Sequence, residues 1–259
     1  MDPSPLVRAR DRVRAAVDRR ACRDATEPLD LDQLVSPLRY DIMVRAEYFD
    51  FLVERLDLYD GDFDRYVVEA TTTRYFTWFS KVALTRFHPR HAADPADVLA
   101  AFRERLHRST RLLRSFAAEG FDTRYPISVR TAVPRARTGT GKLVERSYYP
   151  GDGCHRLALL VRAGQRTLPP SHYRIRRTPV RVVIDNTHAL ISEMRLAPEE
   201  YYRFLSRGYA DQIFSEASSL LGYVAAYAPN RLDELSQVIR IDELAFVPTD
   251  RESAARLLE

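Results

Sequence analysis

The residues whose types and spacing could do chemistry lie in one short segment, Gly151-Asp152-Gly153-Cys154-His155-Arg156. A strand that turns through two glycines into the start of a helix exposes backbone N–H groups and the positive end of the helix dipole, and both attract phosphate. Arg156 can add a bidentate, charge-assisted pair of hydrogen bonds, and His155 can add a further donor. The segment therefore predicts a phosphate-binding turn. A tight turn whose Arg and His face solvent is the alternative interpretation.

The elements that must position this turn follow from the spacing of apolar residues. After Gly120 the periodicity predicts strands over 126–133, 144–149 and 178–184 and a short helix over 157–162. The turn-rich residues 137–142 predict the loop between the first two strands, and Gly164 is a typical helix end. The last of these strands is mostly apolar, which predicts that it is covered on both faces.

The first half of the chain is expected to be mostly helical. The predicted helices cover 4–22, 40–58 and several pieces of 63–113, and a further helical segment covers 198–228, before a strand or loop near 238–247. Asp94 followed by Pro95 is typical of a helix N-terminus. Leu29-Asp30-Leu31-Asp32-Gln33-Leu34-Val35 alternates in part like a short strand. Aromatic residues 75–79 are expected to fill a core rather than to line a pocket.

Three segments carry a resemblance to a known family. Leu112-Leu113-Arg114-Ser115-Phe116-Ala117-Ala118-Glu119-Gly120-Phe121, followed by Pro126-Ile127-Ser128-Val129, resembles the helix and strand "L-x-x-S-I-x-x-x-G-x … P-I-x-V" of the ParB/sulfiredoxin superfamily. Residues 151–158, with Gly164 and Leu168-Pro169 after them, resemble its phosphate box "D-G-x-H-R-x-x-A … G … I-P". Residues 29–34 are similar to its opening strand. Order and approximate spacing agree over residues 112–184.

The resemblance implies a small mixed sheet with flanking helices that binds the phosphates of a nucleotide. Gly151, Asp152, Gly153, Cys154, His155 and Arg156 would then hold the phosphates. Members of the superfamily differ in what they do with the nucleotide: some are partitioning proteins that bind CTP and DNA, others are sulfiredoxins that use ATP, and others are kinases of free amino acids such as serine.

For the kinase branch, the chemistry needs ATP, a divalent ion such as Mg²⁺, and a carboxylate that orients or deprotonates the acceptor hydroxyl. Asp152 lies within the phosphate box itself. The resemblance also implies candidates just after the opening strand, where the family's substrate-side acids lie: the carboxylates Asp41 and Glu47, with Arg39 as a further nucleotide contact. No motif decides among them, and ordinary surface charges at a helix start are the alternative interpretation.

The sulfiredoxin branch has the box G-G-C-H-R, and this chain matches four of its five letters, with Asp152 at the first glycine. Cys154, a thiol at a helix N-terminus beside Arg156, would have a lowered pKa and be nucleophilic. Cys154 could equally be a small packing residue. The chain is about twice the usual length of that family, and its helical blocks are not needed for that chemistry.

Charge and composition exclude some partners. Lys+Arg 40 against Asp+Glu 36 gives +4 over 259 residues, too small a surplus for a protein that coats nucleic acid. The helical residues 198–228 mix acidic side chains with tyrosines, a poor match to DNA. Cys22 and Cys154 lie in unrelated contexts, which favours a reducing, cytoplasmic location. No run approaches the roughly 18 apolar residues of a membrane span.

Together these patterns predict an α+β protein. We expect an N-terminal helix (1–28), a ParB/sulfiredoxin-like nucleotide-binding core (29–39 and 109–190), a helical insertion (40–108) and a mainly helical C-terminal segment (191–259). The expected function is an ATP-dependent phosphotransferase that acts on a small hydroxyl-bearing metabolite such as an amino acid, with a homodimer as the possible assembly. The alternatives are a nucleotide-gated DNA-binding or scaffold protein of ParB type and a sulfiredoxin-like enzyme that uses Cys154.

Overall fold

The computed structural model of the chain describes residues 21–87, 89, 92, 94–144, 146–194 and 196–239. It is a mixed α+β structure with a small mixed sheet and several helices, as the sequence predicts. Nearly all of the helix expected over 4–22 lies outside the described residues, but its last residue is described and opens a strand (Cys22–Asp24), so the prediction is wrong there. Nearly all of the segment near 238–247 also lies outside the described residues.

A long central strand, β3 (Ile127–Thr138), organises the sheet. It pairs antiparallel with β4 (Leu143–Val144) and β5 (Tyr148–Asp152), and parallel with β7 (Tyr173–Arg176) and β8 (Val180–Val183). β1 (Cys22–Asp24) extends the sheet beside β7, and β2 (Leu29–Asp30) pairs separately with β6 (Thr167–Leu168). The strands expected on either side of residues 137–142 do pair, but the second, expected over 144–149, is divided into β4 and β5, and β3 continues to Thr138 within the expected loop.

Two strand expectations are wrong in part. Residues 178–184 are not covered on both faces, because in β8 only Val183 is fully buried and Val182 is 44% exposed. Residues 29–35 form only the two-residue strand β2 before a helix, α2 (Leu31–Val35), begins. The helix begins there because the Asp30 carboxylate accepts the Gln33 N–H (3.1 Å), which is a typical N-cap contact.

The first half of the chain is helical, as expected. Its elements are α3 (Asp41–Glu54), α4 (Leu56–Gly61), α5 (Phe63–Ala70), α6 (Arg74–Trp78), the π-helical turn η1 (Phe79–Ala83), α7 (Leu84–Phe87) and α8 (Pro95–Glu119). The predicted cap of α8 is confirmed, because Asp94 Oδ1 accepts the Ala96 N–H at 2.8 Å and Pro95 opens the helix. Tyr75 and Trp78 are buried in the core, also as expected.

The second half alternates helices with the remaining strands. Its helices are α9 (Cys154–Arg162), η2 (Pro170–His172), α10 (Asn186–Met194), α11 (Pro198–Tyr209), α12 (Ala217–Tyr227), η3 (Pro229–Arg231) and α13 (Leu232–Val238). The helical segment expected over 198–228 is broken between α11 and α12. Ser206 Oγ accepts the Phe214 N–H there (3.0 Å), which holds the chain in a turn.

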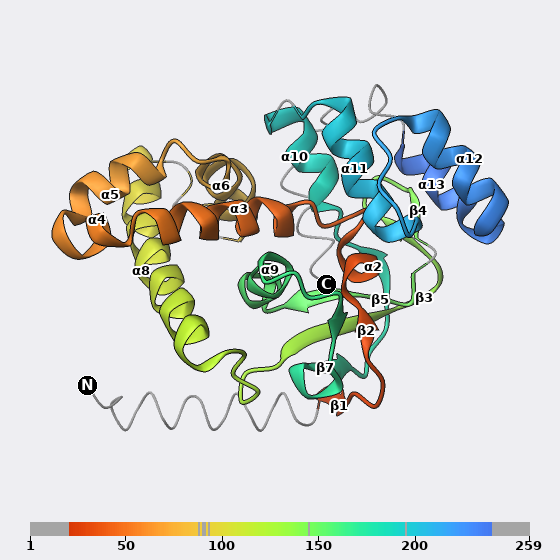
Figure 1. The fold of residues 1–259 in the computed structure, drawn as a ribbon, viewed down its shortest axis with the longest axis horizontal. Helices are drawn as coiled ribbons and strands as arrows, with labels where there is room; N and C mark the ends of the chain where they lie inside the picture. Colours follow the sequence, from red (N-terminus) through yellow and green to blue (C-terminus); the bar gives the residue numbers. More distant parts are fainter. Residues whose placement is uncertain are drawn as a thin grey trace.

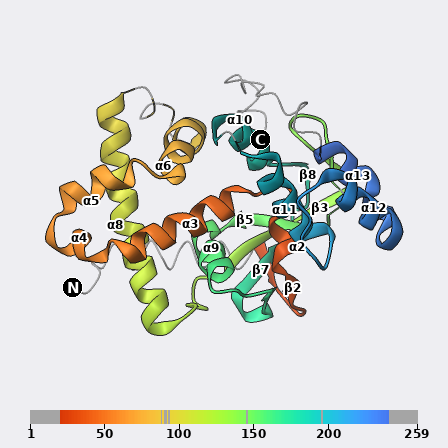
Figure 2. The same ribbon diagram turned by 45° about the horizontal axis from the view of Figure 1, so that its top comes forward.

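α9 occupies the centre of the molecule, between α3 and the sheet. Both ribbon views show α3 lying next to α9, with α4 and α5 at one end of the molecule and α12 and α13 at the other (Figures 1 and 2). One hydrophobic core joins Phe49 and Leu52 of α3 to Leu157 of α9 and Ile127 of β3. The helices of residues 40–108 and the sheet therefore contribute side chains to the same hydrophobic core.

Within the described residues, no helix combines the length and the apolar content that crossing a lipid bilayer requires.

Packing of the helical half predicts a large effect of one core substitution. Phe102 on α8 is fully buried against Phe76 and Phe79. We expect Phe102→Ala to lower the free energy of unfolding by about 3–5 kcal/mol, measured by urea denaturation, because it leaves a cavity. Leu99→Ala on the exposed side of the same helix should change it by about 0.5 kcal/mol or less. Equal losses in the two variants would contradict this packing.

Candidate functional site

The segment Gly151–Arg156 forms a tight turn from a strand into a helix. β5 ends at Asp152 and α9 begins at Cys154, so the helix starts three residues earlier than expected. Gly153 joins them with φ +87°, and a Cβ there would lie 3.3 Å from the Cα of Ile127. Only glycine fits this backbone easily. Asp152 Oδ1 accepts the Gly153 N–H at 2.7 Å, which fixes the turn.

A cavity of about 850 Å³ lies beside this turn. Asp152 and Arg156 both line it, so the structure brings these two predicted site residues together. The other charged side chains of the lining come from outside the turn: Arg108, Arg111, Asp122, Arg124, Arg174 and Arg176. Six guanidinium groups thus face two carboxylates, and this surplus favours a ligand with several negative charges. We call this cavity the arginine pocket.

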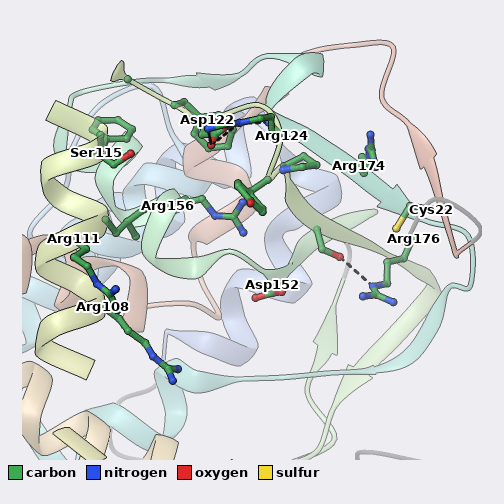
Figure 3. Close-up of a pocket in the computed structure, with 17 residues that line it drawn as sticks. Cys22, Arg108, Arg111, Ser115, Asp122, Arg124, Asp152, Arg156, Arg174 and Arg176 are labelled. Carbon is green, nitrogen blue, oxygen red and sulfur yellow. Dashed lines mark hydrogen bonds and ion pairs between the residues drawn. The ribbon is translucent and has the colours of Figure 1, made fainter. Parts of the chain in front are cut away.

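The arginines approach the arginine pocket from different elements. Figure 3 shows Arg108 and Arg111 projecting from α8 on one side, Arg174 and Arg176 on β7 on the other, and Arg156 between them. Arg176 Nε donates to Ser128 Oγ at 3.1 Å, which fixes this guanidinium against β3. The negative charges of a ligand would therefore contact guanidinium groups on both sides of the pocket.

The second carboxylate of the arginine pocket, Asp122, is already engaged. Arg124 donates to both of its oxygens, at 2.7–3.1 Å, and these hydrogen bonds lower the pKa of Asp122. Asp122 therefore stays ionised and balances the charge of Arg124. Asp152, the other carboxylate of the lining, lies in the turn itself.

Arg39 and Asp41 lie behind the turn, where neither lines the arginine pocket. Both are buried, and Arg39 donates to the two Asp41 oxygens at 2.8 and 2.9 Å. Arg45 donates to the same carboxylate. Burial alone would raise the pKa of Asp41, but Arg39 and Arg45 outweigh it and hold the pKa well below its usual range. Asp41 therefore stabilises the fold by pairing with two buried arginines, and it is not placed to accept a proton from a ligand in the arginine pocket.

Cys154 also faces away from the arginine pocket. Its Sγ lies 3.0 Å from Nη2 of Arg39, and the same guanidinium donates to the Pro150 carbonyl oxygen at 3.0 Å. The thiol is partly buried and makes no disulfide. A nucleotide in the arginine pocket would meet Arg156 rather than Cys154.

His155 points into the helical half instead of toward the expected phosphates. Its Nε2 lies 2.8 Å from the Tyr75 hydroxyl, and its ring meets Phe49 edge-on. Burial lowers the pKa of His155 well below its usual value, and the charges of Arg45 and Arg105 add to this effect. The imidazole is therefore neutral at pH 7 and links α9 to α6.

Glu47 belongs to a separate surface cluster. It lies 3.3 Å from Arg74, which pairs with Glu200 on α11 at 2.7 Å, and Glu200 in turn accepts from Tyr40. Desolvation raises the pKa of Glu47 despite the charge of Arg74. The structure does not bring Glu47 to the arginine pocket.

Most of the arginines that line the arginine pocket were not among the residues predicted from the sequence. A signal for these arginines is present in the sequence. Arg108 and Arg111 lie three residues apart, which places them on one side of a helix, and Arg174 and Arg176 lie two apart, which places them on one side of a strand. Nothing in the sequence alone indicates that these two pairs face the same cavity.

In the part of the chain that the structure describes, the lining of the arginine pocket offers two carboxylates, Asp122 and Asp152, and no cluster of metal ligands. Among the described residues, no three His, Cys, Asp or Glu side chains gather closely enough to hold a metal ion by themselves. Mg²⁺ is commonly held by one or two carboxylates together with phosphate oxygens and water. Mg²⁺ that arrives with a nucleotide would therefore be held mainly by phosphate oxygens and water, without a cluster of protein carboxylates.

Comparisons with known proteins give no relative for this chain: no family model, no curated protein and no solved structure matches it. The site is therefore interpreted from its own residues.

The buried group of Arg39, Asp41 and Arg45 predicts both a mutational loss and a pH dependence. We expect Asp41→Asn to lower the free energy of unfolding by about 3–5 kcal/mol, because two buried guanidinium groups lose their carboxylate. In the native protein, the folded pKa of Asp41 lies below its unfolded value of about 3.9. Its contribution is therefore present above about pH 4 and is lost as the pH falls toward the folded pKa.

The matched control is Asp50→Asn on the same helix, since Asp50 pairs with Arg162 at the surface. We expect this change to cost about 1 kcal/mol or less. Urea denaturation of both variants between pH 3 and 7 measures the two effects. A small loss in Asp41→Asn, or an unchanged acid dependence, would contradict the inferred charge balance.

Proposed function

We propose that the arginine pocket binds a nucleoside triphosphate such as ATP, with Mg²⁺, and that the chain transfers the terminal phosphoryl group to a hydroxyl of a small metabolite such as an amino acid. The observation that carries this proposal is the meeting of five arginines from other elements with the turn that holds Asp152 and Arg156. Such charge is what a triphosphate and a dissociative phosphoryl transition state require.

The phosphates would lie against the start of α9. Arg156, on the first turn of that helix, offers a fork of N–H groups to phosphate oxygens. Arg108 and Arg111 extend from α8 across the cavity (Figure 3). They would bind the phosphate oxygens that lie beyond the reach of Arg156. The cavity volume of about 850 Å³ falls within the range of ligand pockets.

Asp152 would orient the acceptor hydroxyl and take its proton. In the transfer, the acceptor oxygen forms a bond to the terminal phosphorus while the bond from that phosphorus to the leaving diphosphate oxygen breaks. The hydroxyl proton passes to a carboxylate oxygen of Asp152. Bound Mg²⁺ would neutralise charge on the phosphate oxygens. Since Gly153 donates to Oδ1, the carboxylate is held in a fixed direction.

The turn, the mixed sheet and their order along the chain support a ParB/sulfiredoxin-like fold for residues 29–39 and 109–190. Among its branches, the kinase branch agrees best with the positions of the side chains. Cys154 lies on Arg39 and outside the pocket lining, which argues against a step at the thiol. A nucleotide-gated DNA-binding or scaffold protein is the competing function, and it would bind the nucleotide without turnover.

Nucleotide binding is tested with Arg156→Gln. We expect the dissociation constant for ATP with Mg²⁺, measured by calorimetry, to rise at least tenfold, because a charge-assisted pair contributes about 1.5–3 kcal/mol. Arg162→Gln is the control on the same helix, since Arg162 pairs with Asp50 outside the pocket. Absence of ATP binding in the native protein, or equal affinities in the two variants, would overturn the assignment.

Phosphoryl transfer is tested with Asp152→Asn, which keeps an acceptor for the Gly153 N–H. We expect kcat to fall by about 100- to 10,000-fold on the accepted substrate, while ATP affinity changes only a few-fold. Products are followed by ³¹P NMR with pools of hydroxyl-bearing metabolites. Cys154→Ser should keep most of the activity. Nucleotide binding without transfer to any metabolite would favour the gated binding protein instead.

A further inference from the structure

A second cavity, of about 430 Å³, lies between the opening segment, the start of β5 and the C-terminal helices. Its lining is Leu29, Asp30, Gln33, Leu34, Arg146, Ser147, Tyr148, Asn230 and Arg231. None of these residues lines the arginine pocket. The lining combines two guanidinium groups, one carboxylate and several uncharged hydrogen-bonding groups. We call this cavity the bipolar pocket.

Arg146 of the bipolar pocket is a cation with too few partners. Its side chain is 10% exposed, and its buried Nε and Nη1 have no hydrogen-bond partner among the described residues. The nearest carboxylate oxygen, on Glu234, lies 3.5 Å from Nε, and Nη2 reaches the Gly208 carbonyl only at 3.4 Å. Buried charged groups are normally paired and fully hydrogen-bonded. The charge of Arg146 is therefore only partly compensated by the protein.

Arg231 adds a second positive charge at the same place. Its guanidinium stacks on the Tyr209 ring at 4.0 Å, Arg146 approaches that ring at 5.5 Å, and both arginines donate to the Gly208 carbonyl. The buried carboxylate of Glu234 lies 3.5 Å from Nε of Arg146, and no described carboxylate pairs with Arg231. Two guanidinium groups therefore line this end of the cavity and favour an anionic group of a ligand there.

Asp30 supplies the opposite charge in the lining. One of its oxygens caps α2 by accepting the Gln33 N–H, and the residue is otherwise exposed. A ligand with a carboxylate alone would meet the arginines but would also approach this aspartate. A ligand that carries both a carboxylate and an ammonium group matches both charges of the lining.

We infer that the bipolar pocket binds a small zwitterion of the α-amino acid class. The carboxylate would contact Arg231, with the buried charge of Arg146 behind it, and the ammonium group would face Asp30. The amide groups of Gln33 and Asn230 and the Ser147 hydroxyl offer further hydrogen bonds. Two leucines, Leu29 and Leu34, add an apolar wall for a side chain.

This site is separate from the proposed phosphotransferase site. Tyr148 of the bipolar pocket and Asp152 of the arginine pocket stand four residues apart on β5, about 13 Å along an extended strand. The zwitterion would bridge the opening segment, β5 and η3, so its binding would stabilise the docking of the C-terminal helices. The inference does not depend on phosphoryl transfer.

The test uses the full chain and the twenty common α-amino acids one at a time, with acetate and methylammonium as single-charge controls. Calorimetry gives the affinities, and amide hydrogen exchange of residues 229–238 reports the place of binding. We expect at least one amino acid to bind saturably and to slow exchange in this segment. Acetate and methylammonium should bind at least tenfold more weakly.

Two substitutions address the two charges separately. Arg231→Gln removes the cation at the rim, and Asp30→Asn removes the negative charge but keeps a good N-cap residue. Each should weaken binding of the amino acid at least tenfold. Arg124→Gln in the arginine pocket is the control and should leave the affinity within twofold.

Three outcomes would overturn the inference. In the first, no amino acid binds. In the second, the affinity falls in Arg124→Gln but stays unchanged in Arg231→Gln, which would place the ligand in the arginine pocket. In the third, Asp30→Asn has no effect and acetate binds as well as the amino acid, which would define a simple carboxylate site.

Discussion

The rest of the structure depends on the buried guanidinium of Arg39. It ties the start of α3, through Asp41, to the end of β5, through the Pro150 carbonyl, and to the first residue of α9, through Cys154. Removing these charges from water is costly, so the group is stable only because Asp41 and Arg45 complete it. Because Arg39 holds the residues on either side of it, the turn at 151–153 has a fixed position, and this also sets the direction of Arg156.

The same arrangement explains why neighbouring side chains of one motif do different things. Successive residues of an α-helix point about 100° apart, so Cys154, His155 and Arg156 at the start of α9 face three directions. Cys154 turns to Arg39, His155 turns to Tyr75, and Arg156 turns to the arginine pocket. Three consecutive residues that look like one binding motif in the sequence thus have different roles. Cys154 and His155 hold α9 in place, and Arg156 lines the pocket.

Local signals in the sequence predicted local structure well. Asp94-Pro95 marked the start of α8, and the glycines of residues 151–153 marked the turn, because each depends only on near neighbours. The arginine pocket could not be predicted in this way, since the cations that join Arg156 come from α8, β7 and the connection after α8. The burial of Asp41 also escaped prediction: a carboxylate at a helix start is usually solvated, and its enclosure depends on elements that pack on α3 from elsewhere in the chain.

The hydrogen bond between Tyr75 and His155 has a consequence for how the protein can be divided. Removal of residues 40–108 would expose one side of α9, and His155 would lose its contacts with Tyr75 and Phe49. A shortened chain that kept only the sheet, the turn at residues 151–153 and α9 would therefore need polar residues on the side of α9 that becomes exposed. The helical segment is therefore expected to fold as one cooperative unit with α9 and the sheet, because they share one hydrophobic core.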